Sequence, residues 1–273
     1  MALATLDDTE LFYQVVGQGL SCLVLHGGLG LDHTYFRPWL DPLGDRLQLV
    51  YYDHRGNGRS DRPLSETLTF DHLCRDAEAL RTSVGAEQVV LLGHSLGGFV
   101  ALEYALRYPE RVSHLILVDS AASFDYGEEI EANIHRKQPS PEVLAAASAP
   151  APPTDAEFGQ MWRAVLPLYF HRYEAGLAEA AFGQTIYSAS AAAGSGALFA
   201  IYNVVPRLPE IQIPTLVIAG DDDFVCPPSQ ARRLQAGLPQ AQLVILPGCG
   251  HFPFIECPAA FEAALHSWLD QVI

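Results

Sequence analysis

The sequence predicts an α/β fold, in which a mostly parallel central sheet is flanked by helices and a helical cap is inserted between two core strands. Short apolar runs typical of buried strands alternate with helical segments through most of the chain. This alternation stops between about 123 and 208, where strand-like runs largely vanish, and then resumes. We therefore expect a core domain made of 1–122 and 209–273, and a helical cap subdomain made of 123–208.

The individual elements follow from local patterns. β-branched and aromatic residues predict a strand at 10–16, and Leu73, Ala77 and Leu80 recur at helical spacing in a segment that Gly85 ends. The same criteria predict further strands at 21–25, 48–52, 89–92, 112–118, 215–220 and 242–246, and helices at 70–84, 96–107, 142–147, 155–166, 173–182, 229–238 and 258–273.

The composition excludes several classes of partner. Apolar residues make up 49% of the 273 residues, which is too many for a disordered chain. The formal charge of -16 repels phosphate backbones and anionic headgroups, so we expect neither nucleic acid nor a membrane as a partner. No apolar run is long enough to span a membrane, and the first residues lack the basic start of a signal peptide. We therefore expect a soluble, cytoplasmic protein.

The cysteine pattern predicts a reducing compartment. Five cysteines are an odd number, and no two of them form a CxxC pair, so we expect free thiols. Cys249 lies two residues before His251, and a redox-sensitive role for it is the alternative to a small residue in a tight loop.

A candidate nucleophile lies at the end of the strand at 89–92. The apolar run stops at Gly93, and Ser95 then lies between Gly93 and Gly97 in the pattern Gly-x-Ser-x-Gly, followed by an Ala/Leu-rich helix. In such a strand–turn–helix elbow, the two glycines let strand and helix pass closely. The backbone N–H of Leu96 then points from the positive end of a helix at the group that the serine attacks. The alternative is a glycine-rich turn without chemistry.

Two other turns follow strands. The loop His26-Gly27-Gly28-Leu29-Gly30 lacks the lysine of a P-loop and the GxGxxG dinucleotide pattern. We expect the Gly28 N–H to be the second oxyanion donor and His26 to be structural. The turn over 53–60 contains Arg55 and Arg59. We expect both to be paired with carboxylates there, the alternative being an anion site.

Ser95 needs a base and a carboxylate that orients the base, and both follow later strands of the chain. Three aspartates, 221–223, follow the strand at 215–220, and His251 follows the last strand. The residue types alone leave Asp221, Asp222 and Asp223 open for the acid. His94 and His266 are the alternatives to His251 as the base.

These motifs together resemble the α/β-hydrolase family over nearly the whole chain. His-Gly-Gly, Asp-x-Arg-Gly-x-Gly-x-Ser, Gly-His-Ser-Leu-Gly-Gly, Gly-x-x-Asp-x-x-x-Pro and Gly-His-Phe occur in the family's order. The family pattern implies Asp223 as the catalytic acid. The chain is similar to the branch of proline iminopeptidases and related esterases, with two departures. Leu29 replaces the proline of the usual His-Gly-Gly-Pro-Gly, and Phe224 stands where iminopeptidases commonly have a glutamate.

The resemblance implies a serine hydrolase that uses Ser95, His251 and Asp223 and needs no cofactor or metal. We expect it to cleave small-molecule carboxylic esters, or lactones such as acyl-homoserine lactones, through an acyl-enzyme. The alternatives are a proline iminopeptidase-like aminopeptidase or amidase, and a small-ligand receptor on the same fold. Apolar and aromatic residues are the candidates for the pocket wall: Leu29, Trp162, Tyr169, Phe170, Tyr187, Phe199, Tyr202 and Phe224.

Overall fold

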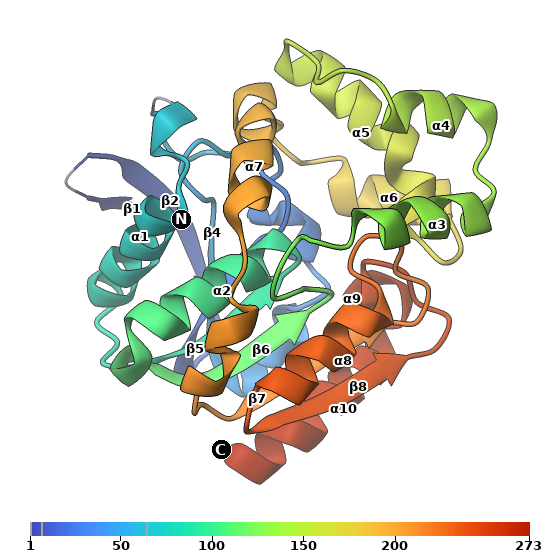
Figure 1. Cartoon of the computed structure of the whole chain (residues 1–273). Coiled ribbons are helices and arrows are strands. Elements are labelled where there is room, and N and C mark those ends of the chain that lie inside the picture. Colours follow the sequence, from blue (N-terminus) through green and yellow to red (C-terminus); the bar gives the residue numbers. More distant parts are fainter. Residues whose placement is uncertain (1, 7, 64) are drawn as a thin grey trace.

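The computed structural model describes residues 2–6, 8–63 and 65–273. Its strands form one sheet in the order β1-β2-β4-β3-β5-β6-β7-β8, in which β2 is antiparallel to β1 and to β4, and β3 to β8 are parallel (Figure 1). The strands are β1 (Ala2–Thr5), β2 (Glu10–Val16), β3 (Leu20–Leu25), β4 (Leu47–Tyr52), β5 (Val89–His94), β6 (Val112–Val118), β7 (Thr215–Gly220) and β8 (Ala241–Leu246).

Helices cover both faces of the sheet. The apolar faces of α1 (Phe70–Ser83), α2 (Leu96–Arg107) and α8 (Pro228–Gly237) join one core cluster, and α10 (Pro258–Val272) joins the cluster on the other face. Every residue of the central strands β5 and β7 is buried, as expected for parallel strands covered on both sides. No helix in the described part of the chain is long and apolar enough to cross a membrane.

The segment between β6 and β7 is helical. It contains α3 (Gly127–Lys137), α4 (Pro141–Ala147), α5 (Asp155–Tyr169), α6 (Ala175–Phe182) and α7 (Ala189–Ile201). Figure 1 shows α3 to α6 grouped beyond the end of the sheet at which β6 and β8 terminate. The short α9 (Pro253–Glu256) precedes α10, and 3-10 turns occupy His33–Phe36, Asp41–Asp45, Ser65–Thr67, Pro109–Arg111 and Val205–Glu210.

Most of the predicted elements agree with the structure to within a few residues, but four described strands and α-helices were not predicted: β1, α3, α7 and the one-turn α9. β1 is four residues long, and α7 contains two glycines and two serines, so neither shows a clear periodic pattern. α3 starts at Gly127, and five of its 11 residues are Glu, Lys or Arg. In addition, α5 continues to Tyr169, past the predicted end, with Pro167 inside its last turn. Packing on the rest of the protein therefore decides these elements more than local propensity does.

Candidate functional site

Ser95 lies between β5 and α2 in a backbone conformation that side chains rarely adopt, with φ 54° and ψ −125°. Its N–H donates to Val118 O at 3.0 Å. A Cβ on Gly97 would collide with the carbonyl oxygen of Leu25, and one on Gly93 would lie 2.6 Å from the Cα of Gly98. Small residues at these positions thus allow the tight turn that holds Ser95 in place.

The glycine-rich loop after β3 lies directly against Ser95. A Cβ on Gly27 would be 2.7 Å from the Ser95 Cβ. The loop is fixed by two short hydrogen bonds, from Gly27 N to the Tyr35 hydroxyl and from Gly30 N to Asn57 Oδ1, each 2.6 Å long. Gly28 has φ 51°, and no described residue accepts a hydrogen bond from its N–H. That donor is therefore available beside Ser95.

His94 is held on both ring nitrogens. Its Nδ1 is 2.9 Å from the hydroxyl of Tyr35, and its Nε2 is 2.8 Å from the carbonyl oxygen of His251. A carbonyl can only accept, so Nε2 carries the proton and Nδ1 accepts from Tyr35. Burial lowers the pKa of His94 well below its ordinary value, in agreement with this neutral form. His94 therefore positions the backbone of His251, and His266 lies apart on α10.

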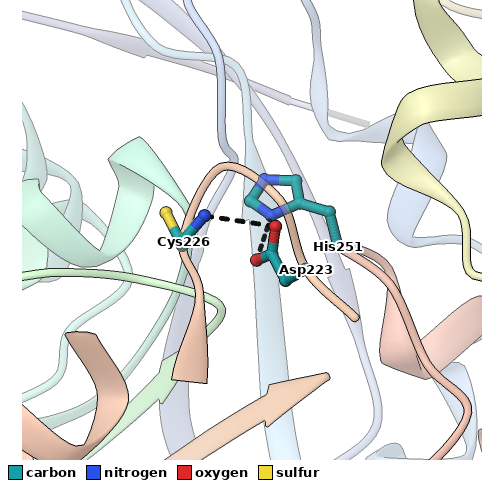
Figure 2. Close-up of side chains that lie close together, drawn as sticks. All are labelled: Asp223, Cys226 and His251. Carbon is teal, nitrogen blue, oxygen red and sulfur yellow. Dashed lines mark hydrogen bonds and ion pairs between the residues drawn. The ribbon is translucent and has the colours of Figure 1, made fainter. Parts of the chain in front are cut away.

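Asp223 and His251 form a buried pair (Figure 2). Asp223 Oδ2 is 2.7 Å from His251 Nδ1, and Asp223 Oδ1 accepts from the N–H groups of Val225 at 2.9 Å and Cys226 at 3.1 Å. These hydrogen bonds stabilise the ionised carboxylate. Both residues follow strands that end at the same edge of the sheet as β5.

The two neighbouring aspartates have other partners. Asp221 Oδ1 accepts from Gly248 N at 2.8 Å, and Asp222 Oδ2 is 2.7 Å from Lys137 Nζ. Of the three aspartates, only Asp223 has a hydrogen bond to His251.

One group of side chains in the described part of the chain could hold a metal ion: Asp223, Cys226 and His251, whose ligand atoms lie within 4.8 Å of one another. However, Asp223 already accepts from His251 and from two backbone N–H groups. Burial also raises the pKa of the Cys226 thiol well above its ordinary value, which disfavours the thiolate that a metal needs. These contacts favour a hydrogen bond between the Asp223 carboxylate and the His251 imidazole over a metal site.

Ser95 and His251 open onto one cavity of about 420 Å³. Gly28 and Leu96 also line it, and residues of α5 and α7 form part of its wall. Among the described residues that line this cavity there is no Asp, Glu, Lys or Arg. Five of the predicted pocket residues line it: Leu29, Trp162, Tyr169, Phe199 and Phe224.

The other three predicted pocket residues are not among the described residues that line this cavity. Phe170 is buried against Phe252, with ring centroids 5.5 Å apart. Tyr187 packs beside Phe158 at 6.0 Å. Tyr202 stacks on Phe99 at 4.3 Å and donates to a backbone oxygen. The rings of Phe170 and Tyr202 thus pack between the helical segment and neighbouring elements, whereas the ring of Tyr187 packs within the segment.

The other polar residues of the two early turns are structural. His26 Nε2 accepts from His54 N at 3.0 Å, and burial lowers the pKa of His26. Arg55 is buried, with its guanidinium 2.6 Å from Asp76, and Arg59 is 3.0 Å from Asp32. Carboxylates therefore pair both arginines, as the sequence predicted, although their partners lie mostly outside the turn.

The expectation of five free cysteines was wrong. Cys249 and Cys257 form a disulfide with their Cα atoms 6.4 Å apart, whereas Cys22, Cys74 and Cys226 are free and buried. The pair is eight residues apart in the sequence and brackets His251. No spacing motif in the sequence marks this disulfide. The helix α9 lies between the two cysteines and brings them together.

A set of hydrogen bonds joins the end of α5 to the segment around His251. His251 N donates to Tyr169 O at 2.7 Å. Glu256 accepts from Gly250 N at 2.6 Å through one oxygen and from His171 N at 2.8 Å through the other. Burial raises the pKa of Glu256. The helical segment and the backbone of His251 are thus held as one unit.

Sequence reasoning missed three residues near the site: Tyr35, Asp119 and Glu256. Tyr35 lies in a 3-10 turn and Glu256 in a one-turn helix, and neither belongs to a motif. Asp119 could have been found, because it directly follows β6, and Asp223 lies three residues after the end of the neighbouring strand β7. Polar residues at the carboxyl ends of parallel strands gather at the ligand-binding edge.

Comparisons with known proteins agree with this geometry. Residues 22–258 match the family model described as the alpha/beta hydrolase fold. A proline iminopeptidase from Lactobacillus helveticus is 30% identical over 290 residues, covering 96% of this chain and 95% of that protein. Two solved structures are each 26% identical. An esterase from Thermogutta terrifontis has a TM-score of 0.76, with 97% of this chain and 94% of that one covered. A proline iminopeptidase-related protein from Thermus thermophilus has a TM-score of 0.79, with 100% and 97% covered.

The family match covers most of the chain, and the relatives are described as a proline iminopeptidase, an esterase and a proline iminopeptidase-related protein. The chain therefore belongs to the α/β-hydrolase family and resembles its proline iminopeptidase and esterase branch.

Proposed function

We propose that this protein is a serine hydrolase that cleaves carboxylic esters of uncharged, apolar acids, including lactones, which contain the same bond in a ring. The observation that carries the proposal is the cavity of about 420 Å³ that joins Ser95 to His251. Its described lining is mostly aromatic and aliphatic and contains no Asp, Glu, Lys or Arg. An apolar acyl group gains about 0.8 kcal/mol for each methylene buried there.

The reaction uses an acyl-enzyme. Ser95 Oγ attacks the carbonyl carbon while His251 Nε2 takes its proton, and Asp223 holds the imidazole through Nδ1. The N–H groups of Gly28 and Leu96 stabilise the oxyanion. Collapse of the tetrahedral intermediate expels the alcohol, which receives the proton from His251. A water then attacks the acyl-Ser95 ester with His251 as the base, and the carboxylic acid leaves.

The alternative is an exopeptidase, since the Lactobacillus helveticus relative is a proline iminopeptidase. Such an enzyme must hold a substrate ammonium beside the reacting carbonyl, and an unpaired buried charge costs several kcal/mol. Phe224 follows Asp223 and lines the cavity, so it offers no carboxylate. Glu129 near the start of the helical segment is hydrogen-bonded to Ser229 at 2.7 Å, and Glu128 and Glu131 are exposed. These contacts favour the ester reaction.

The test compares kcat/KM for p-nitrophenyl butyrate with that for prolyl and alanyl p-nitroanilides. We expect the ester to be preferred by at least 100-fold. We also expect kcat/KM for p-nitrophenyl butyrate to exceed kcat/KM for p-nitrophenyl acetate by on the order of 15-fold, because two more methylenes are buried at about 0.8 kcal/mol each. Ser95→Ala should abolish turnover, and Ser83→Ala, a change on α1, should not. Equal or higher values for the anilides would refute the ester proposal and leave the exopeptidase.

A further inference from the structure

Asp119 is a second carboxyl group at the carboxyl edge of the sheet. It follows β6 directly, has no exposed surface, and takes a left-handed backbone conformation with φ 44°. Its N–H donates to Ile218 O at 2.9 Å, and its Oδ1 accepts from Gly220 N at 2.8 Å. The end of β7 therefore fixes the backbone and one carboxyl oxygen of Asp119 immediately beside the segment that carries Asp223.

The other carboxyl oxygen of Asp119 has no donor. Oδ2 is buried, and no described residue donates a hydrogen bond to it. The neighbouring carboxyl group that acts on Asp119 is that of Asp223, and both residues bond to Gly220: its N–H donates to Asp119 Oδ1, and its carbonyl oxygen accepts from Asp223 N at 3.4 Å. Two carboxylates can only accept, so a contact between them is a hydrogen bond only when one of them carries a proton. A buried acceptor without a partner costs about 1–3 kcal/mol, which a shared proton avoids.

The charges around the pair decide which carboxyl holds the proton. The charged groups that act most strongly on Asp119 are the carboxyls of Asp223 and Glu256, and both disfavour a negative charge on Asp119. Asp223 accepts from His251 and from two backbone N–H groups, whereas Asp119 accepts from one N–H. More donors stabilise the charge on Asp223, and like charges that share a site do not both ionise. Burial, with the Asp223 charge as the second cause, also raises the pKa of Asp119 well above its ordinary value.

We propose that Asp119 is a positioning residue that stays protonated and donates a hydrogen bond from Oδ2 to the Asp223 carboxylate, which keeps that carboxylate aligned with Nδ1 of His251. This inference rests on the proposed hydrolase function. Asp119 touches neither substrate nor Ser95, and it acts on the reaction through Asp223. The proton remains on Asp119 throughout the cycle.

The first test measures protonation directly. Infrared difference spectra between the wild type and Asp119→Asn at pH 8 should show the carbonyl stretch of a protonated carboxylic acid in the wild type alone. Asp270→Asn removes a carboxyl that is exposed on α10 and paired with Arg46, and it serves as the control. A wild type without such a band overturns the proposal, and this measurement does not depend on turnover.

The second test measures what the donor does. Asp119→Leu has a similar shape but no donor, and we expect about a tenfold loss of kcat with p-nitrophenyl butyrate. Without the donor, the Asp223 carboxylate attracts the imidazolium more strongly, so the acid limb of the kcat/KM profile should move to higher pH. Asp119→Asn keeps a donor in its amide, so most of the loss should be rescued and the limb should stay in place. In an Asp223→Asn background, Asp119→Leu should cost less than twofold, because the charge that it stabilises is gone.

Other outcomes refute the proposal in different ways. If both Asp119 variants move the acid limb to lower pH, Asp119 is ionised in the wild type. If Asp119→Leu lowers only the unfolding temperature and leaves the pH profile unchanged, its role is structural. If Asp119→Leu does not fold, the infrared band and the pH profile of Asp119→Asn still test the proposal. Ester turnover that survives in Ser95→Ala would refute the proposed function itself, independently of the infrared result.

Discussion

The change Asp223→Asn tests the catalytic assignment most sharply, because the hydrogen bonds dictate how the new side chain must lie. Oδ1 of Asp223 accepts from the N–H groups of Val225 and Cys226, so the asparagine carbonyl oxygen has to take that position. Its amide nitrogen then replaces Oδ2, which lies 2.7 Å from His251 Nδ1. An amide N–H can only donate, so Nδ1 must accept and the imidazole proton moves to Nε2.

That tautomer cannot take the proton of Ser95. The expected loss is on the order of 10⁴ in kcat, equivalent to about 5.4 kcal/mol of transition-state stabilisation. Asparagine has the same shape as aspartate, so we expect the fold to persist with little change in the unfolding temperature. KM should change far less than kcat, because Asp223 does not line the cavity.

Asp221→Asn and Asp222→Asn are matched controls from the same loop. Asp221 contacts Gly248 N and Asp222 contacts Lys137, so we expect each variant to stay within tenfold of wild-type kcat with p-nitrophenyl butyrate. Circular dichroism is the check that each variant is folded. If either control loses more activity than Asp223→Asn, or if Asp223→Asn stays within tenfold of the wild type, the reasoning from these hydrogen bonds is wrong.

Three further predictions concern the oxyanion donor, the disulfide and the buried carboxyl. Gly28→Pro removes an N–H, and proline cannot adopt the φ of 51° found at Gly28, so kcat should fall by at least about 10²; a folded variant with wild-type kcat would assign the donor to Leu29. Replacing Cys249 and Cys257 by serine should lower the free energy of unfolding by about 2.5 kcal/mol in a urea titration, because the disulfide closes a loop of eight residues; an unchanged midpoint would contradict this. Folding raises the pKa of Asp119, so its contribution is present at low pH and lost as pH rises. Relative to Asp119→Asn, wild-type stability should therefore fall by up to about 1.4 kcal/mol per pH unit above pH 4, and a difference independent of pH would refute the raised pKa.

The sequence determined the order of the core and the approximate place of its chemistry. Apolar runs set the strands, because parallel strands buried on both faces must be apolar throughout. The Gly93-x-Ser95-x-Gly97 pattern marked the turn, because only small residues fit where the backbones of β5, α2 and β3 approach one another. Both signals are local, so they are readable in a single chain.

Tertiary structure decided everything that depends on contacts between distant segments. The sequence could not separate Phe199, which lines the cavity, from Tyr202, which stacks on Phe99, because both are aromatic residues near the end of α7. It likewise left the pairing of Cys249 with Cys257 unseen, since no spacing rule applies to it.

The carboxyl groups illustrate the same division. The strand pattern places Asp119 and Asp223 at the ends of two strands, and pairing of β6 with β7 makes those ends neighbours. The sequence does not say which carboxyl faces His251 and which one lacks a donor. That choice follows from the loop after β7, whose backbone N–H groups turn toward Asp223 and leave Asp119 with the single N–H of Gly220. Electrostatic roles of buried groups depend on such three-dimensional donor counts, which no linear pattern encodes.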